Sequence, residues 1–289
     1  MTQGTLFLCA TPIGNLGDIS SRVIETMREA DLIAAEDTRN SIRLLNHFGI
    51  STPMTSYHEY NKVEKAYALI EKMKAGANIA LVTDAGTPAI SDPGEVLVKM
   101  CQEAGIRVTS LPGPAACITA LTLSGLPTRR FCFEGFLPAE KKERTEILED
   151  LKGEKRTIIL YEAPHHLKRT LAFLYETLGQ RRITICRELT KKFETVMPTT
   201  LSDACIYYEE NEPRGEYVLV MEGRDKAELE SERQKSFSQI PMEEQVAAYE
   251  QQGMDHKEAM KQVAKDRGIT KREVYQYLLD RKDTKNVKK

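Results

Sequence analysis

The chain has 289 residues, a length that predicts about two domains with enough core to fold without a metal or disulfides. It is 41% hydrophobic and 29% charged, and no apolar run approaches the roughly 20 residues that span a bilayer, which excludes a membrane protein. The N-terminus lacks the basic flank and long apolar region of a secretory signal, so we expect a cytoplasmic protein.

The net charge of −2 is unevenly distributed along the chain. From residue 255 to the end there are 11 Lys and Arg residues against 6 Asp and Glu residues, so the preceding part is acidic. A basic tail on an acidic body indicates that the tail, and not the body, binds a negatively charged partner such as nucleic acid.

The first part of the chain predicts an α/β domain over residues 1–125. Strand-like runs at 5–10, 31–35, 79–83 and 106–111 alternate with helical patterns at 20–29, 39–48, 59–75, 93–104 and 114–124. Such alternation predicts a mainly parallel sheet with helices on both faces.

A second α/β domain is predicted over residues 126–223. It begins with an apolar run at 131–136 and continues with a helix at 139–152, a strand at 157–161, a helix at 165–178 and strands at 183–187 and 217–222. Because parallel signals are fewer here, we expect a mixed sheet.

The remainder is predicted as a polar linker at 224–240, a helical domain resembling a helix-turn-helix at 241–282 and a basic tail at 283–289. Asp255 with Glu258, and Thr270 with Glu273, fit capping boxes that begin helices near 256 and 271. Basic residues crowd the turn between these helices and are candidates for phosphate contacts: Lys265, Arg267, Lys271 and Arg272. A small helical cap with a solvated face is the alternative.

Candidate ligand loops follow the strands of the first domain. Residues 10–18, 36–39, 84–94 and 111–116 concentrate Gly, Pro and acidic side chains where the carboxyl ends of parallel strands meet. The chain contains neither G-x-G-x-x-G in this context nor a P-loop motif, so dinucleotide and P-loop nucleotide binding are disfavoured.

Neither the cysteines nor the histidines form a pattern typical of a metal site. The six cysteines include no C-x-x-C pair, and most lie in apolar runs. His165 and His166 are adjacent and lack a third ligand at a suitable spacing. We therefore predict no metal.

Several of these segments together resemble the ribosomal RNA small subunit methyltransferase I family, the RNA-acting branch of the tetrapyrrole methylase superfamily. They are residues 11–18, 35–39, 84–88 with 92–94, 111–114 and 187–191, and the resemblance covers residues 4–223, with a similar helix-turn-helix extension in the tail. It implies a two-domain α/β tetrapyrrole-methylase-like (class III methyltransferase) fold, a homodimer, and S-adenosyl-L-methionine bound between the domains. It also implies 2′-O-methylation of a cytidine in the decoding region of 16S ribosomal RNA, free or in the 30S subunit.

The resemblance also implies the positions of the cofactor contacts. They are Ile13, Asp84, Ala85, Gly86, Thr87, Ile90, Pro114, Ala115 and Ala116, with Ala163 and Glu216 completing the pocket. Arg39 and the basic residues of the tail are the expected RNA contacts.

Methyl transfer from a sulfonium is an in-line displacement that requires alignment more than acid catalysis. The ribose hydroxyl must still lose its proton to a carboxylate or a neutral amine. The candidates are Glu36, Asp37, Glu188 and Lys191. Each also has a structural alternative, because acidic residues at 36–37 can cap the next helix and the charges at 187–194 can pair with one another.

Two alternative functions remain at this point. A methyltransferase of this superfamily can act on a tetrapyrrole, another small molecule or a modified protein residue, but such an enzyme has no need of the basic helical tail. A non-catalytic regulator that binds nucleic acid through the tail would leave the loops of the first domain unexplained.

Overall fold

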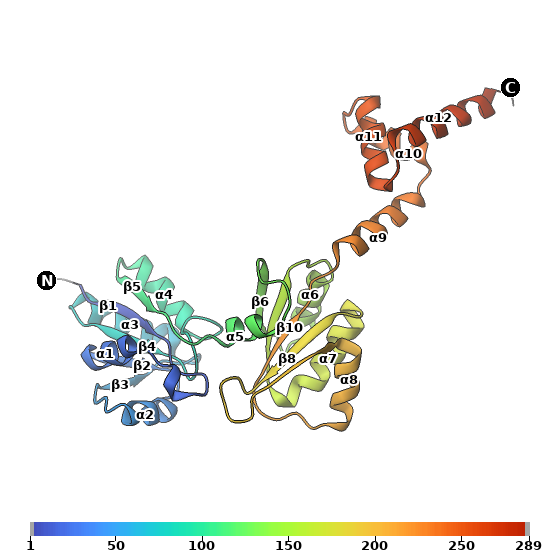
Figure 1. Cartoon of the computed structure of the whole chain (residues 1–289). Helices are drawn as coiled ribbons and strands as arrows, with labels where there is room; N and C mark the ends of the chain where they lie inside the picture. Colours follow the sequence, from blue (N-terminus) through green and yellow to red (C-terminus); the bar gives the residue numbers. More distant parts are fainter. Residues whose placement is uncertain (1–2, 287–289) are drawn as a thin grey trace. The chain divides into compact units, whose positions relative to one another are not determined.

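The computed structural model describes residues 3–286. The chain divides into two compact units, Met1–Gly223 and Arg224–Lys289 (Figure 1). The predicted basic tail at 283–289 falls partly in the last helix, and residues 287–289 lie outside the described part.

The first half of unit 1 is built on a five-stranded parallel sheet of order β3-β2-β4-β1-β5. Its elements are β1 (Thr5–Cys9), η1 (Leu16–Asp18), α1 (Ser21–Glu29), β2 (Leu32–Ala35), α2 (Thr38–His47), β3 (Met54–Ser56), α3 (Lys62–Lys74), β4 (Ile79–Val82), α4 (Gly94–Glu103), β5 (Arg107–Leu111) and α5 (Ala116–Leu123).

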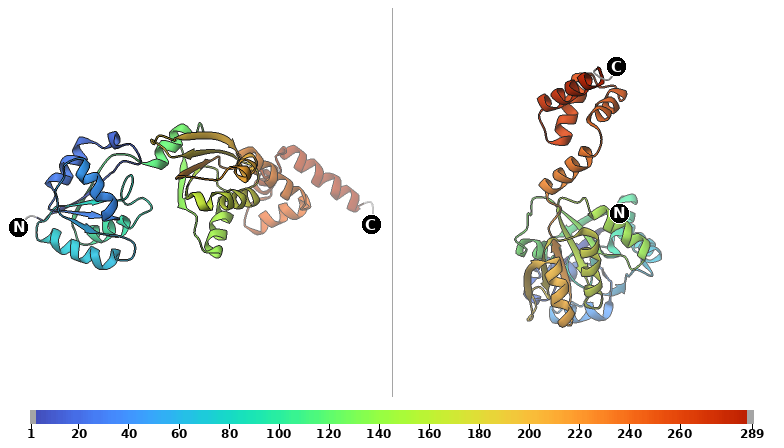
Figure 2. Two further views of the ribbon diagram at one scale, coloured as in Figure 1. Left: turned by 90° about the horizontal axis from the view of Figure 1, so that it is seen from below. Right: turned by 90° about the vertical axis from the view of Figure 1, so that its right-hand side faces the viewer.

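Helices cover both faces of this sheet, which confirms the predicted architecture (Figure 2). On one face α1 and α2 bury Val23, Met27 and Leu45 against the strands, and on the other face α3 and α4 bury Met73 and Leu97. Because both faces are covered, β4 is buried along its whole length and reads as a continuous apolar run.

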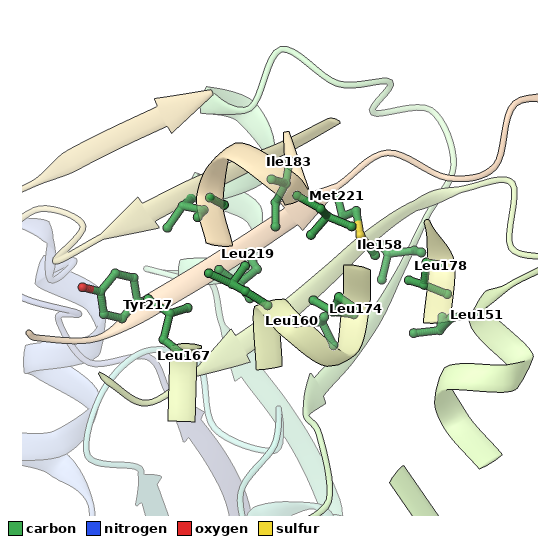
Figure 3. Packing of buried hydrophobic residues seen from close by; sticks show 14 of the residues in the cluster. Leu151, Ile158, Leu160, Leu167, Leu174, Leu178, Ile183, Tyr217, Leu219 and Met221 are labelled. Atoms are coloured by element: carbon green, nitrogen blue, oxygen red, sulfur yellow. The ribbon is translucent and has the colours of Figure 1, made fainter. Parts of the chain in front are cut away.

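The second half of unit 1 contains a mixed sheet of order β6-β7-β10-β8-β9, as predicted. The β6/β7 pair is parallel, and the other pairs are antiparallel. Its elements are β6 (Phe131–Phe136), α6 (Lys141–Leu151), β7 (Thr157–Glu162), α7 (Pro164–Leu178), β8 (Arg182–Arg187), β9 (Thr195–Thr200), α8 (Leu201–Glu210) and β10 (Tyr217–Met221). Figure 3 shows the core in which leucines of α7 pack on β7, β8 and β10.

Helix α5 requires a correction to the predicted boundary after residue 125. Its buried side chains Cys117, Ala120 and Leu121 pack on β7 and β10, so α5 covers the second sheet and not the first. The helix is apolar on nearly all sides. Its sequence therefore does not indicate which of the two sheets it covers. Ile13 and Leu189 join the same cluster and connect the two halves.

Unit 2 is helical: α9 (Lys226–Ser238), α10 (Met242–Gln251), α11 (His256–Arg267) and α12 (Lys271–Asn286). The segment 224–240, which we predicted as a linker, is mostly the helix α9, because its Ala, Leu, Glu, Lys and Gln residues all favour helix despite the lack of an apolar stripe.

The capping predictions are confirmed. Asp255 accepts from the Glu258 backbone N–H at 2.8 Å, and Gly268 ends α11 with a φ of 66°. The Thr270 backbone N–H donates to Glu273 and the Glu273 N–H donates to Thr270 Oγ1 at 3.2 Å, forming a reciprocal box.

Candidate active site

The loops that follow β1 and β4 lie side by side at the carboxyl ends of the first sheet. Thr11 and Gly86 exchange backbone hydrogen bonds of 2.9 and 3.1 Å, and the buried Thr11 hydroxyl donates to the Thr83 carbonyl at 3.3 Å. Gly86 has a φ of 87°, a left-handed conformation that suits glycine. The two loops therefore form one wall.

The loop from Thr83 to Gly94 is organised by Asp92. Its carboxylate accepts hydrogen bonds from the backbone N–H groups of Ala89, Ile90 and Gly94 at 3.0, 3.2 and 2.7 Å. These bonds hold Ala89 and Ser91 at positive φ values of 68° and 60°. The Thr87 hydroxyl donates to the Pro114 carbonyl at 2.9 Å, which ties this loop to the loop after β5.

A cavity of about 470 Å³ lies against this wall, between the two halves of unit 1. It is lined by Ile13, Glu36, Thr83, Asp84, Ala85, Gly86, Thr87, Ile90, Ser91, Asp92, Ala115, Ala116, Phe136, Tyr161, Glu162, Ala163, Pro164, Leu189, Glu216, Tyr217 and Val218. The volume is that of a small-molecule site.

Most of the positions expected to hold the cofactor are brought together in this cavity. Ile13, residues 84–87, Ile90, Ala115 and Ala116 line it, as do Ala163 and Glu216. Pro114 is outside the lining and instead accepts the hydrogen bond from Thr87.

Carboxylates line the cavity from both halves. Glu36, after β2, accepts hydrogen bonds through Oε2 from the Thr83 hydroxyl at 2.6 Å and from the Asp84 N–H at 3.5 Å. Glu162, at the end of β7, is buried and accepts hydrogen bonds from the Ala163 N–H and the Thr170 hydroxyl. Partial desolvation, together with the neighbouring Glu36, raises the pKa of Asp84 above its ordinary value.

Asp37 lies outside the cavity lining and caps α2. Its Oδ1 accepts from the Arg39 N–H at 2.8 Å, and its Oδ2 pairs with the Arg39 guanidinium at 2.8 Å. These bonds lower the pKa of Asp37 to about 2. The side chain of Arg39, a predicted RNA contact, is 88% exposed.

Glu188 and Lys191 also lie outside the lining and form an ion-paired group with Glu216. The Lys191 Nζ is 3.0 Å from Glu188 Oε1 and 2.8 Å from Glu216 Oε2. Partial burial acts to raise the pKa of Glu188, but hydrogen bonds from the Glu216 N–H and from Lys191 lower it overall. The group reaches the cavity through Glu216.

On the side of the second sheet the resemblance implied Ala163 and Glu216, but the other residues of this wall were missed. Phe136, Tyr161, Glu162 and Tyr217 belong to β6, β7 and β10, whose ends adjoin the first half. The Cys117 N–H donates to Tyr161 Oη at 3.2 Å, which fixes the ring at the cavity. A usable signal was Glu162-Ala163-Pro164, where a carboxylate ends a buried strand and a proline begins the next helix.

The basic residues of unit 2 differ in their surroundings. Lys265, Lys271 and Arg272 are exposed. Arg267 is half-buried and donates to Gln245 Oε1 at 2.8 Å and to the Ile240 carbonyl, so its guanidinium holds α11 to the start of α10. A phosphate contact, which the sequence predicts for Arg267, would need the same guanidinium that makes these hydrogen bonds.

Within residues 3–286 no helix is long and apolar enough to cross a bilayer. Nor do three or more His, Cys, Asp or Glu side chains cluster for a metal ion anywhere in the part of the chain that the structure describes.

Comparisons with known proteins agree with this architecture. The family model described as "Tetrapyrrole (Corrin/Porphyrin) Methylases" matches residues 5–205. Relatives named "Ribosomal RNA small subunit methyltransferase I" include one from Synechocystis sp., 47% identical over 279 residues (96% of this chain, 98% of the relative). Another, from Halalkalibacterium halodurans, is 49% identical over 274 residues (94% of each chain).

Solved structures with the same fold are more distant in sequence. A diphthine synthase aligns with a TM-score of 0.60 at 15% identity, covering 75% of this chain and 89% of that one. A uroporphyrin-III-C-methyltransferase from Thermus thermophilus aligns with a TM-score of 0.54 at 16% identity, covering 75% and 94%. These likenesses establish the fold alone.

Proposed function

The chain belongs to the ribosomal RNA small subunit methyltransferase I family of S-adenosylmethionine-dependent tetrapyrrole methylases, and on this premise we propose that it methylates the 2′-hydroxyl of a cytidine in 16S ribosomal RNA. We place the nucleotide in the decoding region of the small subunit. The observation that carries the proposal is the cavity at the carboxyl ends of β1 and β4, where the loops of the first sheet meet the second sheet.

The residues of this cavity fit the methyl donor. Its volume of about 470 Å³ lies within the roughly 300–1,000 Å³ typical of small-molecule sites. Ile13 and Leu189 offer apolar contacts, and Gly86 leaves room where a Cβ would lie 3.3 Å from Ile13 Cγ2. When bound, S-adenosylmethionine supplies an activated methyl group on a positively charged sulfur. Glu36 and Glu162 give the cavity a negative charge that favours such a cation.

The acceptor hydroxyl must lose a proton as the new bond forms, and a carboxylate within about 3 Å is suited to accept it. Of the four candidates from the sequence, Glu36 lines the cavity. Asp37 is held as a helix cap, and Glu188 and Lys191 hold Glu216, so we propose that these three position the site. The wall formed by Glu36 and Asp84 is where we expect the proton to be taken up.

Unit 2 is proposed to hold the RNA through its phosphates. Lys257, Lys261 and Lys265 follow one another at intervals of four on α11, and Lys271 and Arg272 begin α12; all five are exposed. Residues at this spacing share one helix face, so the lysines form a basic stripe. Phosphate contacts orient a substrate without reading its sequence, and Arg39 offers a further cation on unit 1.

An assembled small subunit is the proposed substrate, because the body of the enzyme is acidic and gains little from naked RNA. The same family relationship supports a homodimer as the active form and the cytoplasm as its location.

The experiment that tests this function supplies purified protein with methyl-labelled S-adenosylmethionine and unmodified small subunits or free 16S RNA, at low and high magnesium. Calorimetry measures donor binding, and primer extension locates the labelled nucleotide. We expect one labelled cytidine ribose in the decoding region. Transfer to a tetrapyrrole in place of RNA, or failure to bind the donor, would overturn the proposal.

A further inference from the structure

A second cavity of about 330 Å³ adjoins the first. The loop after β1 forms one side of it and α2 the other, and the end of β4 closes it. Thr83 and Asp84 line both cavities, so these two residues form the wall between them. An acceptor placed in the second cavity is therefore next to a donor placed in the first.

The second cavity has the chemistry of a sugar-phosphate site. Asn40, Arg43 and His47 project from α2 into its lining, at spacings that place them on one helix face. Arg43 is exposed, and no carboxylate among the described residues pairs with it. Leu16 and Leu44 supply apolar surface beside these polar groups. Such a lining suits an anion attached to a partly apolar group, as in a nucleotide.

The carboxylate of Asp84 is held in a defined orientation at the shared wall. Its Oδ1 accepts from the Asp37 N–H and its Oδ2 from Asn40 Nδ2, both at 3.2 Å. Glu36 lines the first cavity but not the second, and its Oε2 is occupied by the Thr83 hydroxyl at 2.6 Å. Of these two carboxylates, Asp84 is the one that faces both cavities.

We propose that the second cavity binds the acceptor nucleotide, with its phosphate against Arg43 and His47 and its ribose hydroxyl at Asp84, which takes the proton. This inference rests on the proposed function and names the acceptor site for it. The hydroxyl oxygen forms a bond to the methyl carbon as the carbon–sulfur bond breaks, and the electron pair of that bond stays on sulfur. The hydroxyl proton passes to the Asp84 carboxylate, which leaves a neutral thioether, a methylated ribose and a protonated Asp84.

The charges around Asp84 suit this role. Glu36 and Asp37 lie close enough to act on Asp84 electrostatically, Arg39 pairs with Asp37, and Arg43 lines the second cavity together with Asp84. Desolvation, then the negative charge of Glu36, raises the pKa of Asp84, which makes its carboxylate a better proton acceptor than an ordinary one. Because Asp84 must be ionised, the rate should fall as the pH drops through this raised pKa.

The first test is Asp84→Asn, which removes the basic oxygen and keeps the shape of the side chain. We expect the single-turnover rate on unmodified small subunits to fall by about 10²- to 10⁴-fold, the typical contribution of a general base. Because Asp84 is one of many residues that line the donor cavity, donor affinity in calorimetry should fall far less than the rate, and the acidic limb of the pH–rate profile should disappear. A variant that keeps the wild-type rate, or whose donor affinity falls as much as its rate, overturns the assignment.

The second test is Arg43→Gln and His47→Gln, with Arg107→Gln as the matched control. Arg107 is exposed at the first residue of β5, at the amino end of this parallel strand, whereas the cavities lie at the carboxyl ends of the strands. Each change at the cavity should raise the subunit concentration needed for half-maximal rate, and loss of the Arg43 phosphate contact should reduce the salt slope of binding by about one. The control should match wild type. If Arg43→Gln and His47→Gln also match wild type, the nucleotide binds elsewhere.

Failure of the function and failure of this inference are distinguishable in the same assay. Wild-type protein that labels no RNA refutes the proposed function and, with it, the acceptor site. Wild-type protein that labels RNA, with normal rates for the three cavity variants, refutes the acceptor site alone.

Discussion

Single residues determine how closely the two halves of unit 1 approach at the donor cavity, and Gly14 is the clearest case. A Cβ at this position would lie 2.4 Å from Lys191 Cγ and 3.1 Å from the Leu189 carbonyl oxygen. The adjacent Asn15 N–H donates to Thr190 Oγ1 at 3.1 Å, so the loop after β1 rests directly on the loop after β8. Leu189 and Ile13, which adjoins Gly14 in the chain, both line the cavity.

Gly14→Ala should therefore widen the cavity and weaken donor binding. Adding a methyl group to a packed contact costs about 1–3 kcal/mol of folding stability. Because the contact adjoins Ile13 and Leu189 in the cavity lining, we also expect calorimetry to show a loss of S-adenosylmethionine affinity. Gly153→Ala is the matched control, because a Cβ at Gly153 meets nothing within 4 Å. Equal affinities for the two variants would contradict this account of the junction.

At the scale of elements, the sequence predicted those with strong periodicity and missed those without it. β3 has three half-buried residues, and β9 is an edge strand with polar residues and Pro198, so neither shows an apolar pattern. Helix α8 follows β9 directly and was missed with it. Helix α9 was missed because a polar helix has the composition of a linker.

The sequence predicted those parts of the site that are formed by loops with a distinctive composition. Gly, Pro and Asp after β1, β4 and β5 marked three of the segments that form the donor cavity. On the side of β7 and β10 the resemblance alone implied Ala163 and Glu216, because strand order decides which strand ends adjoin, and local sequence does not encode that order. For the same reason the sequence left open whether Glu188 and Lys191 contact the substrate or pair with each other, pairing being the commoner fate of such charges.

The capping box in the turn between α11 and α12 allows a test of what stabilises the start of α12. Thr270→Ala removes the side-chain half of the capping box, which typically costs about 1 kcal/mol, so the melting transition of unit 2 should move to a lower temperature. Hydrogen bonds from the Thr270 hydroxyl and N–H lower the pKa of Glu273. The box therefore stabilises the helix above the ordinary glutamate pKa and loses this effect as the pH falls through the lowered one.

Thr270→Ser keeps the hydroxyl and should melt like wild type when both variants are followed by circular dichroism at neutral pH. At a pH below the lowered pKa of Glu273 the difference between Thr270→Ala and wild type should shrink. Thr270→Ala with an unchanged transition at neutral pH would show that packing around Val274, not the cap, begins α12.

At the scale of the whole molecule, we expect donor binding and RNA binding to be assigned to different units, in line with the uneven charge distribution. Unit 1 contains both cavities within one compact body, held by the cluster in which α5, Ile13 and Leu189 pack against the second sheet. Unit 2 carries the exposed basic residues of α11 and α12 on its own small core around Val263 and Val274. Donor binding should then depend on unit 1 alone, whereas affinity for RNA should depend on both units.

A chain ending at Gly223, where the two units divide, tests this separation. It should bind S-adenosylmethionine as the full chain does but bind small subunits more weakly and with less dependence on salt. If Lys257, Lys261, Lys265, Lys271 and Arg272 each neutralise one phosphate, the slope of log affinity against log salt should decrease by about 4. The full-length chain with Lys257, Lys261, Lys265, Lys271 and Arg272 all changed to Gln should reproduce the smaller slope, because it keeps the helices and removes only their charge. A truncated chain with the slope of the full protein would show that unit 1 holds the RNA by itself.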